Sequence, residues 1–505
     1  MEALRGANLL AFMTSSSAGD VARTTEAVDA LPRWARRLDA VCFGLLLLAL
    51  VVAQWGGFRE QVGSMRVALT SPWRVLAVAI LLGAVRHWRY PSPAIWIDLP
   101  PRLMGAARSD AAKIGWRAFF GTRPVILFLG FMAVSMFGYR MERPPIRFSD
   151  NELMNLQVRW DMGWYYGIAV DGYLVLTDDP RAQQNIVFFP AFPMATRVVG
   201  RLLGGSAPAF IAAGTIVALV AFFWAMTYLF RLAREETGDA DRARFAVWLV
   251  AAYPFAVFFS AFYTESLYLL GVLGAFYHFR RRELWKAGVW GLLVGLTRPN
   301  GCFLSIPLAV LAVMPWLPTW LGGGPADDAV RAPERKTFGA LASSMVAAAM
   351  PGIGVLLYSA YIWRLTGNPI AWAAGHAAWG REYNGLWSVV VDRYNWLFHI
   401  GVYEYLTKVP FDVLNSLGAL FVLAAVIPAA RRLGLAYAVF ILVNLLPPLA
   451  EGGMLSIGRL TSVLFPAFLW YAAVVPERHR SGWLTVFMAG QGFCAALFYT
   501  WRELF

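Results

Sequence analysis

The charged residues best suited to chemistry lie in short polar stretches between long apolar runs. The first stretch, "RWDMGWYYGIAVDGY", holds two carboxylates among five aromatic side chains, and the others are "FYTES", "TRPNG" and "SIGRLTS". The candidates they carry are Asp161, Asp171, Glu265, Arg298 and Arg459. A carboxylate can take a proton from a hydroxyl group, and an arginine can pair with an anion. These types therefore suit transfer chemistry at a polar centre.

The elements that position these residues are membrane helices. Of 505 residues, 59% are hydrophobic and 15% are charged, against roughly 25% charged in soluble domains. Apolar runs near the length of about 20 residues that spans a bilayer recur along the chain. We therefore predict an all-α polytopic membrane protein, because only helices or closed barrels pair every backbone amide in lipid. The net charge of +13 comes from arginines at the ends of apolar runs, which argues for cytoplasmic anchors and against nucleic-acid binding.

Charge bias between the runs predicts the topology. The three predicted parts are a flexible cytoplasmic tail over 1–37, a transmembrane hairpin with a basic cytoplasmic segment over 38–120, and a catalytic transmembrane domain over 121–505. About thirteen spans are expected, with a helix near 124–139 that leads into outer loops at about 140–206 and 366–408. The segment 185–205 is expected on the membrane surface, because prolines break its first turns and Arg197 and Arg201 its second half. All five candidates then fall on the extracytoplasmic side.

Each candidate also has a structural reading. Asp161 precedes a predicted helix whose stripe is Trp164, Ile168 and Gly172, and it fits an N-cap. Glu265 fits a cap of the helix that follows it. Arg298 and Arg459 fit snorkelling anchors at helix ends. Asp171 fits a turn before Gly172.

Five motifs in order carry a resemblance to a known family. They are "RWDMGWYYGIAVDGY", "NIVFFPAFP", "FFSAFYTESLYLL", "GLTRPNG" and "TGNPIAWAAGHAAWGR". In this order and spacing, over roughly residues 120–475, the chain resembles the PIG-V family, which includes the second mannosyltransferase of GPI-anchor assembly and bacterial relatives. It departs from the family pattern at His376, where glutamine is expected.

The resemblance implies a glycosyltransferase of the C type (GT-C), which takes a sugar from a polyprenyl-phosphate carrier at the outer leaflet. It implies Asp161 as the catalytic base, and mannose as the sugar. Predicted donor phosphate and sugar contacts are Arg298, Arg459, Glu265, Trp160, Trp164 and Tyr165. Secondary candidates are Asp171, His376, Trp379 and Arg381.

No dense acidic cluster surrounds Asp161, so no metal ligand and no obligatory cofactor are predicted. A divalent cation, Mg²⁺ or Mn²⁺, stays open. The predicted partners are the membrane, a polyprenyl-phosphate-sugar donor, and a glycan, lipid or protein acceptor. The predicted location is a bacterial inner (plasma) membrane, with the active site on the periplasmic side.

Two alternatives remain. A transporter or flippase of lipid-linked saccharides is also polytopic and aromatic, although it should hold its ionisable residues near mid-membrane on broken helices. A scaffold subunit with its catalytic partner elsewhere would not need Asp161.

Overall fold

The computed structural model describes residues 31–55, 58–62, 65–91, 99–141, 146–175, 179, 182–316 and 337–504. Most of the predicted tail over 1–37 lies outside these residues. The chain divides into two compact units, Met1–Asp110 and Ala111–Phe505.

The first unit contains a helical hairpin at the predicted place, and its crossing of the membrane stays a prediction. Its elements are α3 (Arg33–Trp55), β1 (Phe58–Val62), β2 (Met65–Leu69), α4 (Pro72–Arg89) and α5 (Leu99–Arg108). The polar stretch between the two long helices forms an antiparallel strand pair with Phe58 opposite Leu69. The helices pack together, and the buried guanidinium of Arg86 on α4 lies 2.8 Å from the carboxylate of Asp39 on α3.

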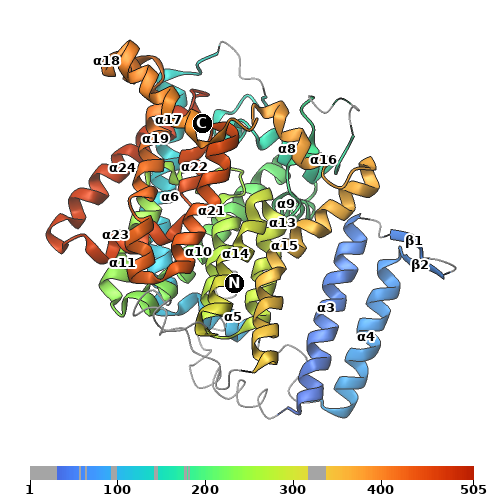
Figure 1. Ribbon diagram of the computed structural model, residues 1–505. Helices are drawn as coiled ribbons and strands as arrows, with labels where there is room; N and C mark the ends of the chain where they lie inside the picture. The colour runs from blue at the N-terminus through green and yellow to red at the C-terminus, as the bar shows by residue number, and fades with distance from the viewer. Residues whose placement is uncertain are drawn as a thin grey trace, which may run out of the picture. The chain divides into compact units, whose positions relative to one another are not determined.

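The second unit is a bundle of helices of very unequal length (Figure 1). Its α-helices are α6 (Asp110–Phe137), α7 (Glu152–Asn155), α8 (Met162–Val170), α9 (Ala191–Leu202), α10 (Ala207–Thr237), α11 (Ala240–Ala252), α12 (Glu265–Arg280), α13 (Leu284–Thr297), α14 (Ser305–Val313), α15 (Phe338–Thr366), α16 (Ala371–Ala374), α17 (Gly385–Asn395), α18 (Val402–Lys408), α19 (Pro410–Leu423), α20 (Val426–Leu433), α21 (Leu435–Gly452), α22 (Ile457–Thr461), α23 (Phe465–Val474) and α24 (Glu477–Tyr499). Short 3-10 or π turns join them at η1 (Asn185–Val187), η2 (Pro254–Ser260), η3 (Pro299–Leu304), η4 (Met314–Trp316), η5 (Gly375–Trp379) and η6 (Trp396–Ile400).

Membrane-spanning character is plain in the part of the chain that the structure describes. Seven of its helices are long and apolar enough to cross a bilayer, and an eighth span results if α11 and η2, which meet at 79°, count as one. The all-α polytopic fold class is therefore confirmed, whereas the count of thirteen spans stays a prediction. Helix α9 has 12 residues, short of the about 20 that a crossing needs.

Helix α6 begins earlier than the sequence indicates. We expected a start near Pro124, but the helix runs from Asp110 through that proline. Its first turns pack on α10, where a Cβ at Gly115 would lie 2.7 Å from Thr227 Oγ1. This packing outweighs the one backbone hydrogen bond that a proline removes.

Close packing at glycines fixes the hairpin of α12 and α13. A Cβ at Gly271 would lie 2.7 Å from Val294, and one at Gly274 would lie 2.6 Å from Trp290. Small residues of this kind let membrane helices approach closely. Because the two helices are consecutive and antiparallel, the residue that starts α12, Glu265, meets the residue that follows α13, Arg298.

A buried arginine closes the break between α11 and η2. Arg123 on α6 is fully buried, and its guanidinium donates to the carbonyls of Ala251 (2.7 Å) and Ala256 (2.6 Å) and to Ser260 Oγ (3.1 Å). The side-chain amide of Gln491 on α24 also donates to the carbonyl of Ala251 (3.0 Å). A broken helix at membrane depth needs such partners for its freed carbonyls.

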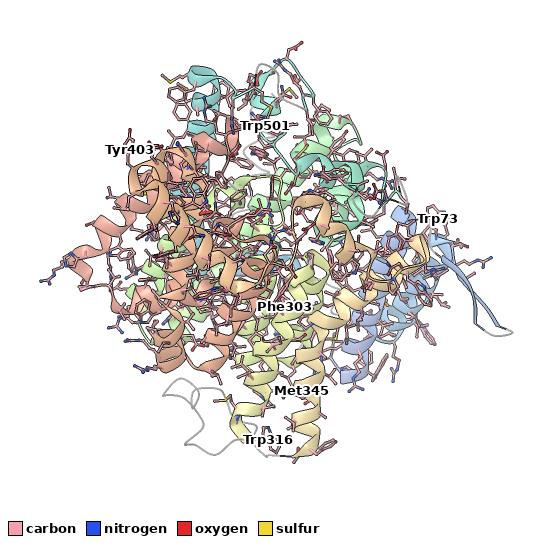
Figure 2. All side chains as sticks on the ribbon, turned by 45° about the horizontal axis from the view of Figure 1, so that its top comes forward. Trp73, Phe303, Trp316, Met345, Tyr403 and Trp501 are labelled. Atoms are coloured by element: carbon pink, nitrogen blue, oxygen red, sulfur yellow. The ribbon has the colours of Figure 1, made fainter. Side chains whose placement is uncertain are left out.

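The short helices α8, α16, α17, α18 and α22 gather toward one end of the second unit (Figure 1). Tyr403 on α18 and Trp501 lie toward this end, whereas Met345 and Trp316 lie toward the other (Figure 2). The candidate residues lie in or beside these short elements.

Candidate active site

Helix α8, which follows Asp161, is held at its far end by an arginine. Arg197 on α9 donates to the carbonyls of Ala169 (2.7 Å) and Val170 (2.8 Å), the last residues of α8. These carbonyls have no partner inside their own helix. Arg197 lies within α9, and its side chain caps the neighbouring helix α8; the predicted place of 185–205 on the membrane surface stays a prediction.

Asp161 lies in the N-cap position of α8 but does not cap it. Its side chain makes no hydrogen bond to the helix amides, and instead its Oδ2 lies 3.2 Å from Nη1 of Arg459. Its backbone N–H donates to the hydroxyl of Tyr263 (3.0 Å). The capping interpretation is therefore wrong, since the carboxylate is turned toward a cation.

A strained residue sets this orientation. Trp160 has a φ of 52°, in the left-handed region that a bulky side chain rarely adopts. Its ring packs on that of Trp501 with centroids 4.9 Å apart, and the preceding Arg159 is buried and donates to the carbonyl of Tyr499 (2.7 Å). Backbone strain of this kind is concentrated at functional sites.

Glu265 bridges two arginines. Its side chain is fully buried, and Oε1 lies 3.1 Å from Nη2 of Arg298 and 3.3 Å from Nε of Arg459. The cap of α12 is Thr264, so the capping interpretation of Glu265 is also wrong. Arg298 is no snorkelling anchor either, because it is 7% exposed and points to Glu265.

Arg459 is placed by a short helix that other elements hold in position. Ser456, just before α22, has a φ of 62°, and the N–H of Gly458 donates to Asn415 Oδ1 (2.6 Å). The guanidinium lies over the ring of Tyr263, 5.5 Å from its centroid. Tyr263 thus supports both Asp161 and Arg459, a role that "FYTES" did not reveal.

The four residues form an alternating chain of charges, Asp161, Arg459, Glu265 and Arg298, whose formal sum is zero. Nη1 of Arg298 and Oε2 of Glu265 are buried and form no hydrogen bond with the residues that the structure describes. The side chain of Asp161 is 23% exposed, whereas that of Glu265 is 0% exposed. Asp161 is therefore the carboxylate that a substrate can reach.

Aromatic residues join the first predicted loop to the second. Trp164 lies near Phe188 and Trp379, with ring centroids 5.9 and 5.7 Å away. Tyr165 is buried against Phe188, and burial raises its pKa, so its hydroxyl stays protonated.

The structure places the secondary candidates in different surroundings. Asp171 is exposed at the far end of α8, outside the charge chain. His376 Nδ1 lies 2.8 Å from the carbonyl of Trp372, and burial lowers the pKa of this imidazole. Arg381 lies against Gly452, where a Cβ would be 3.3 Å from its Nη1.

A metal cluster is not evident at this centre. Within the described ranges, no group of three or more His, Cys, Asp or Glu side chains is arranged to hold an ion. The metal requirement accordingly stays a prediction.

Comparison with known proteins gives one family match. Residues 146–371, just under half of the chain, match the family model described as mannosyltransferase (PIG-V), which confirms the predicted resemblance. Asp161, Glu265 and Arg298 lie inside this segment, and Arg381 and Arg459 lie beyond it. No curated protein matched the chain significantly.

Among solved structures, the chain is similar to the oligosaccharyltransferase of Archaeoglobus fulgidus, crystallised with zinc and sulfate, at 13% identity and a TM-score of 0.38 over 75% of this chain and 53% of that one. It is also similar to AglB from the same organism, in complex with an inhibitory peptide and a dolichol-phosphate, at 13% identity and a TM-score of 0.38 over 76% of this chain and 56% of that one. The chain thus spans about half the length of these structures.

Proposed function

We propose, from the premise that this chain is a membrane glycosyltransferase related over residues 146–371 to the PIG-V mannosyltransferases, that it is an inverting enzyme with Asp161 as its base. The donor is a sugar, mannose, on a polyprenyl phosphate, and the acceptor is a hydroxyl group of a glycan, lipid or protein. The reaction takes place on the extracytoplasmic face, at the periplasmic side of a bacterial plasma membrane.

One observation supports the base above all others. Asp161 is the most accessible residue of the charge chain, and only its Oδ2 is engaged, by Arg459. Its Oδ1 has no hydrogen-bond partner in the part of the chain that the structure describes. An acceptor hydroxyl can therefore donate to Oδ1 without breaking the ion pair.

The chemistry balances without a general acid. Oδ1 takes the hydroxyl proton as the hydroxyl oxygen attacks the anomeric carbon. The bond from that carbon to the carrier phosphate oxygen breaks on the opposite face, and its electron pair stays on the phosphate. Arg459 holds Oδ2 of Asp161 in an ion pair and so orients the carboxylate before the acceptor arrives. The growing negative charge on the phosphate needs a cation.

A transporter is the alternative, and one feature of the structure bears on it. Arg123 lies mid-way along a spanning helix beside a broken one, as a transporter site would. However, its hydrogen bonds go to backbone carbonyls and hydroxyls of its own protein. The four residues of the charge chain instead lie at helix ends, which favours an enzyme.

The test is transfer from radiolabelled polyprenyl-phosphate-mannose by the purified chain with a panel of acceptors. We expect Asp161→Asn to lose transfer by at least about 100-fold, since general base catalysis contributes about that much or more. The matched control is Asp171→Asn, which removes the exposed carboxylate at the other end of α8 and should transfer normally. Full activity in Asp161→Asn would refute the assignment and favour the scaffold reading.

The face of the membrane is tested separately. The substitution Asp150→Cys is made in a chain whose three native cysteines have been replaced, because the side chain of Asp150 is fully exposed. We expect labelling by an impermeant reagent from the extracytoplasmic side. Labelling only from the cytoplasmic side would contradict the proposed orientation.

A further inference from the structure

Two arginines of the second predicted outer loop lie against two consecutive glycines. A Cβ at Gly452 would be 3.3 Å from Nη1 of Arg381, and one at Gly453 would be 3.9 Å from Nη2 of Arg393. The arginines differ in their partners. Arg393 pairs with Asp412, with Nε 3.1 Å from Oδ1. The guanidinium of Arg381 forms no ion pair and no hydrogen bond with any residue that the structure describes.

Arg381 belongs to the surroundings of the candidate active site. Two residues before it, Trp379 packs on Trp164 of α8, with ring centroids 5.7 Å apart. Its guanidinium is within electrostatic range of Asp161, Arg298, Arg459 and Glu451. Burial, together with the charges of Arg459 and Arg298, lowers the pKa of Arg381 to about 10, so the group still carries its charge at neutral pH.

Arg381 differs from Arg298 and Arg459 in that no carboxylate in the part of the chain that the structure describes balances its charge by an ion pair. Asp161 and Glu265 cancel Arg459 and Arg298, so the partly exposed Arg381 adds a positive charge that no carboxylate of the described residues pairs with. Glu451 also acts on Arg381, but it is exposed and forms no ion pair with it. A guanidinium that has no ionic partner among the described residues can still accept one, so the arrangement favours an anion at Arg381.

We propose that Arg381 binds the phosphate group of the lipid-linked donor. This inference rests on the proposed function and gives the phosphate contact, expected from the sequence at Arg298 and Arg459, to Arg381. Arg459 is committed to two carboxylates and Arg298 to one. The guanidinium fork of Arg381 is free for two phosphate oxygens. As the sugar departs, the phosphate gains a second negative charge, so this contact strengthens during the reaction.

The experiment measures binding, not turnover. The full chain in detergent is titrated with farnesyl phosphate and, separately, with inorganic phosphate, by calorimetry. The variants are Arg381→Ala, Arg381→Lys and Arg393→Ala, the last being a matched control on the same loop. We expect farnesyl phosphate to bind Arg381→Ala about 10- to 100-fold more weakly than wild type, as for loss of a hydrogen-bonded charge. Arg381→Lys should be intermediate, because lysine keeps the charge without the fork.

Three results overturn the inference: equal affinity in Arg381→Ala, an equal loss in a folded Arg393→Ala, or farnesyl phosphate binding no tighter than inorganic phosphate. The last would assign the site to free phosphate instead of a lipid. Thermal unfolding of each variant confirms that it is folded. Binding that depends on Arg381 in a chain without transferase activity would contradict the proposed function but support an anion site. Transfer by wild type with undiminished phosphate binding in Arg381→Ala would refute this inference alone.

Discussion

Replacing Glu265 by glutamine keeps the shape of a fully buried side chain and removes its charge. Arg298 loses its carboxylate partner at 3.1 Å, and Arg459 keeps only Asp161. At 3.1 Å and an effective dielectric constant of about 20, the attraction is about 5 kcal/mol. Part of that attraction offsets the desolvation of both ions, and breaking a buried pair by removing one partner costs about 3–5 kcal/mol. We expect Glu265→Gln to be destabilised by that amount.

The assay is thermal and chemical unfolding of the purified chain in detergent, followed by intrinsic fluorescence. The informative comparison is Glu265→Gln with the double variant Glu265→Gln/Arg298→Met. If the loss comes from an uncompensated buried charge, the double variant is the more stable of the two, although it has lost more contacts. A double variant less stable than the single one, or a single variant within about 1 kcal/mol of wild type, would refute the reasoning from charge balance.

Three further predictions concern other parts of the second unit. Arg123→Ala should destabilise the chain by about 3 kcal/mol or more, because it leaves buried carbonyls at the α11 break unpaired, and unfolding in detergent measures this. Trp379→Ala should loosen the second predicted outer loop, so limited proteolysis should cut faster within 366–408. The control Phe398→Ala changes an exposed ring of the same loop and should leave the rate of cleavage unchanged. His376 has a lowered pKa in the folded chain, so the unfolded chain binds the proton more tightly and stability should fall as pH drops below about 6.5; His376→Gln should flatten this pH dependence of the unfolding temperature.

The sequence was sufficient for the elements and for the choice of charged residues. Apolar runs predicted most long helices of the second unit, and the charge bias placed Asp161, Glu265, Arg298 and Arg459 at one membrane face, where the structure brings them into contact. These charged residues could be predicted because they lie at helix ends, and helix ends can be located from hydrophobic periodicity and charge. It did not require knowledge of side-chain packing.

The sequence could not predict which charged residues form ion pairs within the site. Nothing in "FYTES" indicates that Glu265 would bind two arginines, because the partners lie 33 and 194 positions further along the chain. The left-handed backbone of Trp160 was equally hidden, since such strain depends on the packing of Trp501. The capping role of Arg197 was hidden as well, because its carbonyl partners belong to another helix. An arginine in an apolar segment can anchor that segment at the membrane surface, or it can cap a neighbouring helix as Arg197 does. The local sequence pattern does not distinguish these two roles.

Arg123 carries a consequence for the order of assembly during synthesis. An arginine at the centre of a spanning helix opposes insertion by about 2.5–3.5 kcal/mol. The carbonyls that satisfy it belong to residues 251 and 256, which the ribosome adds about 130 positions later. Helix α6 therefore enters the bilayer before the carbonyls that accept hydrogen bonds from Arg123 have been synthesised. These acceptors become available when α11 and η2 follow. Truncated chains that end before residue 250 should hold α6 loosely in the membrane, and the break in α11 is what locks it there.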